Sequence, residues 1–148
     1  MGLIVVCGAE AAGAAIRELL PNAELVETAA ARISSPSAAV ILGSGGRLCA
    51  DRALGVILSG EDDSAEQLPQ GVQVITVGHG AKNTVSITSI TPDTLTLSLN
   101  RAMNTLRGIA EPFELPVSVR NADNQIGYMA AFAAGVLLGE ISAEGFEG

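Results

Sequence analysis

The segment LIVVCGAEAAGAA at residues 3–15 decides the fold class of this chain. Its first five residues form a short, continuous apolar run, which is typical of a strand covered on both faces. Gly8 then provides a turn, and residues 11–20 are rich in helix formers and end at Pro21. A buried strand that passes through a glycine turn into a helix is the start of a βαβ unit. The sequence therefore predicts an α/β protein with a parallel sheet.

The same segment partly matches the phosphate-loop pattern G-x-x-x-x-G-K-[ST]. Gly8 and Gly13 have the required separation, but Ala14 stands at the lysine position and Ala15 at the Ser/Thr position. Backbone amides at a helix start can still hold an anion, although the carboxylate of Glu10 would repel it. We therefore expect a nucleotide-binding type of loop that lacks the groups needed for hydrolysis.

Further apolar runs predict the rest of the parallel sheet, and each is followed by a polar or glycine turn. They are residues 38–42, 54–58 and 72–77, with a short strand at 23–26 that a βαβ unit requires. After residue 80 apolar and polar residues alternate over 85–89 and again over 95–99. This alternation predicts a half-exposed antiparallel hairpin.

The length of 148 residues predicts a single domain over residues 1–148. We expect a parallel α/β part at 1–80, an antiparallel part at 81–120, a packing helix at 121–139 and a tail at 140–148. Residues 100–107 fit either a helix or a continued strand. The last helix is expected to be capped by Asn121 or Asp123 and closed by Gly139. The acidic tail is expected to be frayed.

Charge and composition exclude several kinds of partner. The net charge is −8, from sixteen acidic and eight basic residues, and no run of Lys or Arg occurs. Nucleic acids and anionic membranes both need a basic face, so we expect neither as a partner.

The apolar segment 128–139 is too short to span a bilayer and no secretory signal is visible, so we expect a cytoplasmic protein. Cys7 and Cys49 lack metal-binding spacing and are expected to be reduced thiols.

Four segments, taken in order, carry a likeness to one family. They are the loop at 8–15, the strand and acidic turn VILSGEDD at 56–63, the strand VITVG at 74–78 with the hairpin after it, and LPV at 115–117 with DNQIGYMAAFAAGVLLG at 123–139. Together they resemble the central, ATP-binding domain of the Mur ligases, which add amino acids to peptidoglycan precursors. Residues 99–116 are also similar to small stand-alone Mur-ligase-like proteins of Gram-positive bacteria, which have no assigned activity.

The resemblance implies a P-loop or Mur-ligase-like fold, with a mostly parallel sheet flanked by helices, a C-terminal antiparallel hairpin or meander, and a final buried helix. It matches Asn124 to a residue that contacts adenine in the family. The family's catalysis needs the loop lysine and magnesium, but alanines replace the loop groups here, and Asp123 and Gly127 replace a histidine and an asparagine of the family's motif. We therefore expect a non-catalytic binding or scaffolding module in a bacterial cytoplasm. We expect no cofactor, with ATP and Mg²⁺ as a disfavoured alternative. The expected partner is an unknown protein or a second copy of this chain.

Other candidate residues each allow two interpretations. One candidate is the acidic run Glu61, Asp62 and Asp63 after a predicted strand, which either offers oxygen ligands to a divalent cation or forms a solvated turn. The solvated turn is favoured, because the loop lacks the hydroxyl that would complete a metal–phosphate site. His79 is an acid–base group or an exposed loop histidine, and the lack of a neighbouring nucleophile favours the second. Lys82 either meets a phosphate or is an ordinary surface lysine.

Two alternatives to the scaffolding role stay open. One is a nucleotide- or dinucleotide-binding enzyme that uses the Gly8–Gly13 loop, with Glu27 as a ribose partner, although the G-x-G-x-x-G spacing is absent. The other is a phosphate or small-anion sensor that uses the glycine loops at 43–46 and 78–80. The first of these loops is either an amide nest for an anion or a flexible turn.

Overall fold

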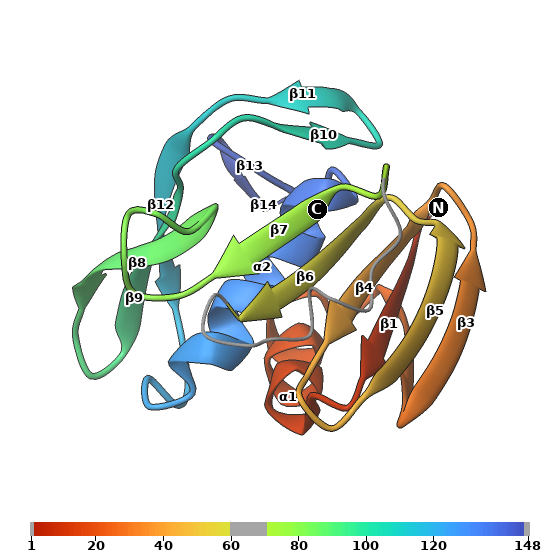
Figure 1. Ribbon diagram of the computed structural model, residues 1–148. Helices are drawn as coiled ribbons and strands as arrows, with labels where there is room; N and C mark the ends of the chain where they lie inside the picture. Colours follow the sequence, from red (N-terminus) through yellow and green to blue (C-terminus); the bar gives the residue numbers. More distant parts are fainter. Residues whose placement is uncertain (1, 60–70, 147–148) are drawn as a thin grey trace.

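The protein has an α/β structure built on one mixed sheet of eight strands (Figure 1). The computed structural model describes residues 2–59 and 71–146, so the acidic turn Glu61–Asp63 lies outside the described residues. In spatial order the strands are β12 (Phe113–Ser118), β9 (Thr94–Leu99), β8 (Val85–Ile90), β7 (Val74–Val77), β6 (Gly55–Ser59), β4 (Ala38–Leu42), β1 (Leu3–Cys7) and β2 (Glu24–Thr28). Neighbours from β2 to β8 are parallel, whereas β9 is antiparallel to both β8 and β12. The predicted α/β class and mostly parallel sheet are confirmed.

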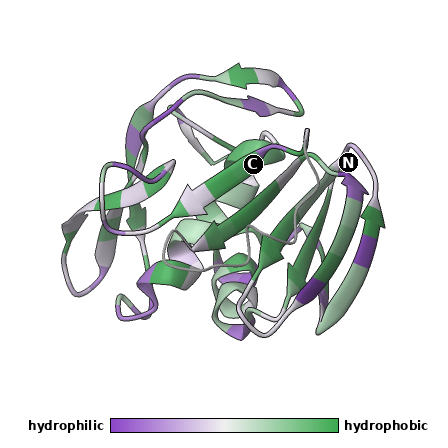
Figure 2. Ribbon diagram, viewed as in Figure 1, coloured by the Kyte–Doolittle hydropathy of each residue, from purple (hydrophilic) through white to green (hydrophobic). Residues whose placement is uncertain are grey.

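Two helices cover one face of this sheet. Helix α1 (Glu10–Leu19) packs against α2 (Gln125–Leu137), and α2 also crosses β4, β6, β7 and β8. Every residue of α2 from Gly127 to Leu137 is buried. Four of the buried positions are alanines, whose small side chains let the helix approach both the sheet and α1 closely. Figure 2 shows the strands β4, β6 and β7 mostly in the green of hydrophobic residues. The predicted final buried helix is confirmed.

A two-stranded parallel ribbon, and not a helix, covers part of the opposite face. It consists of β3 (Ala30–Ser34) and β5 (Arg47–Arg52), and its inward residues pack on Val5, Val40 and Val56. The prediction of a sheet flanked by helices therefore holds for only one face among the described residues. The physical reason is length. The connection between β2 and β4 is residues 29–37, which is shorter than the ten to twelve residues that a crossover with a helix needs.

The antiparallel strands are fully covered on one face and only partly on the other, where Ser86 and Ser98 are buried and bonded to Asn100. Leu95, Leu97 and Leu99 of β9 point toward α2 and are fully buried, while Thr96 between them lies on the other face. The half-exposed antiparallel hairpin predicted from the alternation is therefore confirmed. This part of the sheet has an apolar inner face and a hydroxyl-rich outer face.

Residues 100–107 contain a strand and not a helix, which decides between the two alternatives: β10 (Met103–Thr105) pairs with β11 (Gly108–Ala110) in a projecting arm. Two local predictions need correction. The cap of α2 is Asn124 and not Asn121 or Asp123, because the Asn124 side chain accepts a hydrogen bond from the Gly127 N–H. Finally, the tail is folded up to Phe146, since β13 (Ile141–Ser142) pairs with β14 (Gly145–Phe146) and Ile141 is buried against Gly135. Gly139, with φ of +77°, ends α2 as predicted.

No helix within residues 2–59 and 71–146 has the length and apolar character needed to cross a membrane.

Candidate functional site

The order of the parallel strands places a crevice at the carboxyl ends of β1 and β4. The chain leaves β1 toward β2 on one side, whereas it leaves β4 toward β6 on the other side. In open α/β sheets this reversal opens a crevice where ligands bind. A cavity of about 270 Å³ lies at this point. Its lining consists of Gly8, Ala9, Glu10, Ala11, Ala12, Ile41, Leu42, Gly43, Ser44, Ile57, Leu58, Ser59, Val77, Ile126, Gly127 and Ala130.

The N-termini of both helices line the crevice. The residue before α1 is Ala9, which makes no side-chain cap, so the N–H groups of Glu10 and Ala11 have no acceptor within the helix. The first two N–H groups of α2, at Gln125 and Ile126, also lack intrahelical acceptors. Both helix dipoles therefore favour a hydrogen-bond acceptor in the crevice, whereas the Glu10 carboxylate at its rim opposes a full negative charge.

Asn124 joins the two helix N-termini. Its Oδ1 accepts from Gly127 N at 3.2 Å, and its Nδ2 donates to the Ala11 carbonyl at 2.9 Å. Both ends of the side-chain amide are thus engaged within the protein, and the residue holds α2 against α1 beside the crevice. The contact with an adenine that the family resemblance implies for Asn124 stays a prediction.

The glycines at the crevice let two loops cross in close contact. Gly8 has a φ of +70°, and a Cβ built on it would lie 2.2 Å from the Gly46 nitrogen. A Cβ on Gly43 would lie 2.2 Å from the Gly8 oxygen. The Gly43 N–H donates to the Cys7 carbonyl, and the Gly46 N–H donates to the Gly43 carbonyl. The loop at 43–46 is therefore a hydrogen-bonded turn that packs closely against the Gly8 loop. Anion binding by its amides stays a prediction.

Gly13 lies inside α1 and not in a loop. The helix begins at Glu10, so only Gly8 and Ala9 separate it from β1, which corrects the expected Gly8–Gly13 loop. A Cβ on Gly13 would lie 1.7 Å from a carboxylate oxygen of Glu27, which forms an ion pair with Arg17 across this bare stretch of helix. Gly13 thus makes room for a contact between α1 and β2. Glu27, the predicted ribose partner, is engaged in that contact.

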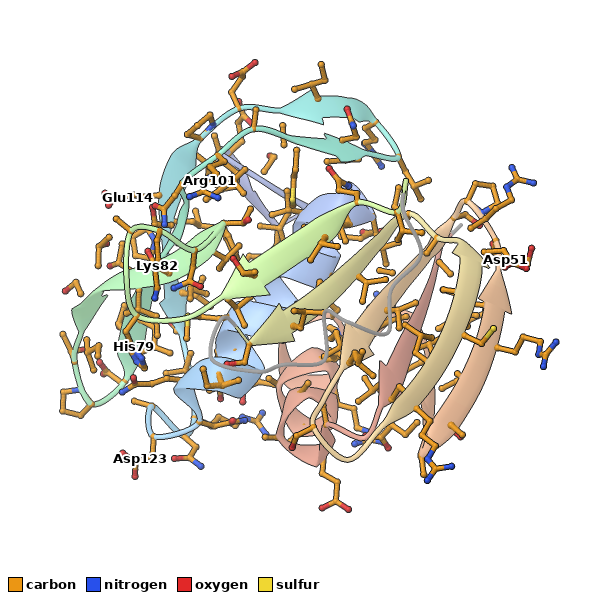
Figure 3. All side chains as sticks on the ribbon, viewed as in Figure 1. Asp51, His79, Lys82, Arg101, Glu114 and Asp123 are labelled. Carbon is orange, nitrogen blue, oxygen red and sulfur yellow. The ribbon has the colours of Figure 1, made fainter. Side chains whose placement is uncertain are left out.

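His79 lies on the loop after β7, beside the N-terminus of α2 (Figure 3). Its Nε2 shares a hydrogen bond with Oε1 of Gln125. This bond joins the loop to the first residue of α2 near the rim of the crevice. Both His79 and Lys82 are exposed, which agrees with the interpretation of each as a surface residue.

Tyr128 forms a buried junction that the sequence did not reveal. Its hydroxyl donates to Oε1 of Glu18 at 2.6 Å and accepts from the N–H groups of Arg120 and Asn121, each at 3.3 Å. Burial raises the pKa of Tyr128, and the carboxylate of Glu18 raises it further. The junction ties α1 to the segment that leads from β12 into α2. Its partners lie 110 residues apart in the chain, so no local pattern could have indicated it.

The described residues contain no group of three or more His, Cys, Asp or Glu side chains able to hold a metal ion. Both cysteines are free thiols, and the buried Cys7 donates to the Arg47 carbonyl at 3.1 Å. Cys49 is exposed, and the reduced state of the two thiols stays a prediction.

No protein-family model matches this sequence, and no curated protein matches it significantly. The likeness to the Mur ligases therefore rests on the four segments quoted above.

Proposed function

We propose that this protein is a non-catalytic binding module, related to the central domain of the Mur ligases, whose ligand site is the crevice at the carboxyl ends of β1 and β4. In this proposal it acts in a bacterial cytoplasm as a ligand-responsive scaffold for a partner protein or for a second copy.

The observation that supports this proposal is the chemistry of the crevice wall. Its described lining is made of hydrocarbon side chains, backbone atoms and two serines, with Glu10 as its one ionisable side chain. A phosphoryl-transfer site needs cationic groups to stabilise the transferring phosphoryl group. Ala14 and Ala15 stand at the sequence positions of those groups, and both are residues of α1.

The same wall indicates the class of ligand. The cavity of about 270 Å³ is slightly smaller than a typical small-molecule pocket, so we expect a ligand smaller than a whole nucleotide. Ile41, Ile57 and Val77 provide an apolar floor, while the N-termini of α1 and α2 provide hydrogen-bond donors. Glu10 disfavours an anion. We therefore expect a small, neutral molecule with an apolar body and a hydrogen-bond acceptor, such as a heterocyclic amide.

A second candidate is a nucleotide- or phosphate-binding enzyme or sensor. The observation that favours it is the convergence of two helix N-termini on one crevice, because such termini commonly bind phosphate. In this case the attraction between the anion and the two helix N-termini would be stronger than the repulsion from the Glu10 carboxylate. Inorganic phosphate and ATP with Mg²⁺ would then bind more tightly than a neutral ligand.

A matched pair of variants tests the proposal. Ile126 lines the crevice and is 42% exposed in the first turn of α2, whereas Ile90 is 51% exposed at the end of β8, away from the crevice. Ile126→Glu puts a carboxylate beside the free amides, where it stabilises the helix start by about 0.3–1 kcal/mol. Ile90→Glu adds the same charge elsewhere. Neutral heterocyclic amides, inorganic phosphate and ATP with Mg²⁺ are then titrated and followed by backbone amide NMR shifts and phosphate release.

The proposal expects a neutral heterocycle to shift the amide signals of residues 8–12, 43–44 and 126–127. Ile126→Glu should abolish these shifts without lowering the melting temperature, and Ile90→Glu should leave them intact. Preferential binding of phosphate at the same amides favours the second candidate. Hydrolysis of ATP by the protein contradicts the non-catalytic role.

A further inference from the structure

The outer face of the β3–β5 ribbon carries a cluster of arginines. Inward residues of the two strands pack on the sheet, so the alternate residues point outward, among them Arg32 of β3 and Arg47 of β5. Arg52 is also exposed at the end of β5, next to Asp51. Three of the eight basic residues of the chain thus lie on one two-stranded ribbon, in a protein with a net charge of −8.

A shallow hollow lies between Arg32 and Arg47. Its floor consists of Ala30, Ala31, Leu48 and Cys49, most of which have small side chains. In the strand register Arg32 lies opposite Cys49, and Arg47 lies opposite Ala30, so the two guanidinium groups flank the hollow from different strands. Neither arginine forms an ion pair within residues 2–59 and 71–146. Both guanidinium groups are therefore available to bind a carboxylate, to which each can donate two parallel hydrogen bonds.

The ribbon also offers free strand edges. In the described part of the chain β3 and β5 pair only with each other, so each has one edge without a strand neighbour. An extended peptide can add to such an edge through main-chain hydrogen bonds, while its alternate side chains reach one face of the ribbon. The spacing of alternate residues along an added strand suits contacts with both Arg32 and Arg47.

We propose that the outer face of the β3–β5 ribbon docks an extended, acidic segment of a partner protein. Main-chain pairing provides the orientation, and the carboxylates of the segment bind Arg32 and Arg47. The acidic remainder of the molecule repels long polyanions such as nucleic acids and anionic membranes, which would extend beyond the ribbon. A short segment meets mainly the arginines, with Asp51 as the one acidic residue of the two ribbon strands. This surface is separate from the crevice and does not depend on the function proposed for it.

The test uses the whole protein and a fluorescent ten-residue peptide in which Glu alternates with Thr or Val. A second peptide has Gln at every Glu position. Binding is measured by fluorescence anisotropy with the wild type and with the double variants Arg32→Glu/Arg47→Glu and Arg32→Gln/Arg47→Gln. The control is Lys82→Glu/Arg101→Glu, which changes the net charge by the same amount as Arg32→Glu/Arg47→Glu. Its two residues are exposed and lie on the side of the molecule opposite Asp51 of β5 (Figure 3).

We expect saturable binding of the Glu peptide that weakens as salt rises from about 50 mM to about 500 mM. Both Arg32/Arg47 double variants should bind about tenfold or more weakly, with unchanged circular dichroism spectra. The control should bind within about twofold of the wild type. Amide NMR shifts should fall on β3 and β5.

Several results would overturn the proposal. One is no saturable binding at about 1 mM peptide, the weakest affinity that a specific contact would give. Equal affinity for the Gln peptide, or an equal loss in the control, would show that the arginine pair has no specific role. Tighter binding to single-stranded DNA or to anionic vesicles would assign the surface to another class of partner. Self-association of the wild type that the Arg32/Arg47 variants abolish would assign it to a second copy.

Discussion

The parallel and antiparallel halves of the sheet differ in how many faces they bury. β1, β4 and β6 pack against helices on one face and largely against the β3–β5 ribbon on the other, and their residues are almost all buried. β8, β9 and β12 pack against α2 on one face. The other face carries mainly hydroxyl groups on β8 and β9, and Glu114, Pro116 and Ser118 on β12. The crevice and the arginine surface both belong to the parallel half. We therefore expect the binding functions in the half of the sheet that the helices cover on one face and the β3–β5 ribbon on the other. The antiparallel half supports α2.

This difference is also a difference in tolerance to substitution. A strand buried on both faces has no position where a polar group finds water, whereas a half-exposed strand offers one at every second residue. Substitutions of the same chemistry at matched places in the two halves should therefore differ in their effects on the free energy of unfolding.

The largest difference is expected at two glycines with positive φ. Gly8 has a φ of +70° and packs against Gly46, whereas Gly108 in the β10–β11 arm has a φ of +102° and no described neighbour within 4 Å of the point where a Cβ would lie. Gly8→Ala combines backbone strain with a clash between two backbones and should cost roughly 3–5 kcal/mol of unfolding free energy. Gly108→Ala carries strain alone and should cost about 1–2 kcal/mol. Urea denaturation of both variants measures the two costs, and equal costs would mean that the loops at Gly8 and Gly46 do not cross closely.

The next difference concerns the second face of each half. Val40 on β4 is fully buried under the ribbon, whereas Thr96 on β9 lies on the hydroxyl-rich face. Val40→Thr buries a hydroxyl group and should cost about 1–3 kcal/mol. The reverse change, Thr96→Val, should alter stability by no more than about 0.5 kcal/mol. Thermal unfolding of the pair measures the contrast, and a harmless Val40→Thr would show that the ribbon does not exclude water from β4.

Much of this fold could be predicted because apolar patterns are local. The continuous run at 38–42 and the alternation at 95–99 indicate the two kinds of strand directly. The ribbon was missed because its strands, AARIS and RLCADR, contain no continuous apolar run and include charged and small residues, which are depleted in strands. β3 lies in a connection that is too short for a crossover helix, and the inward residues of both strands bury apolar surface of the sheet.

The candidate site was predicted in part. The ends of β1 and β4 were recognisable from Gly8 and Gly43, which follow apolar runs. The sequence did not indicate why glycine is required at these two positions, because each glycine packs against backbone that is some 35 residues away in the chain. Asn124 was singled out by the family resemblance, but its hydrogen bond to Ala11 depends on how α1 and α2 pack.

A smaller effect is expected at Tyr128, where α2 joins both halves to α1. Tyr128→Phe removes the hydroxyl from a buried network and should cost about 1–2 kcal/mol at pH 7. Because the pKa of Tyr128 is raised in the folded protein, the unfolded chain loses this proton first as the pH rises. The stabilisation is complete below pH 10, the ordinary value, and is lost as the pH rises from there through the folded pKa.

Above pH 10 the free energy of unfolding of the wild type should therefore fall faster than that of Tyr128→Phe. The difference between the two free energies, the stability gap, should narrow. Denaturation series at several pH values test this. Tyr128 is the sole tyrosine of the chain, so tyrosinate absorbance reports its ionisation without interference. A gap that stays constant from pH 7 to pH 11 would contradict the burial of this hydroxyl.

The smallest effect is expected where the parallel half meets the β10–β11 arm. The Gln73 side chain donates to the Leu54 and Asn104 carbonyls, each at 3.0 Å, and accepts from the Asn104 N–H at 2.8 Å. Gln73→Ala should cost only about 0.5–1.5 kcal/mol, because the arm is exposed and water replaces the lost bonds. Its local effect should be larger, since hydrogen exchange at β10 and β11 should accelerate while exchange at β4 and β6 stays unchanged. Thr96→Val serves as the control, because Thr96 lies on β9 and shares no hydrogen bond with Gln73 among the described residues. If exchange in the arm did not change, its order would have to come from the arm's own pairing and from the Leu106 N–H, which donates to the Leu137 carbonyl.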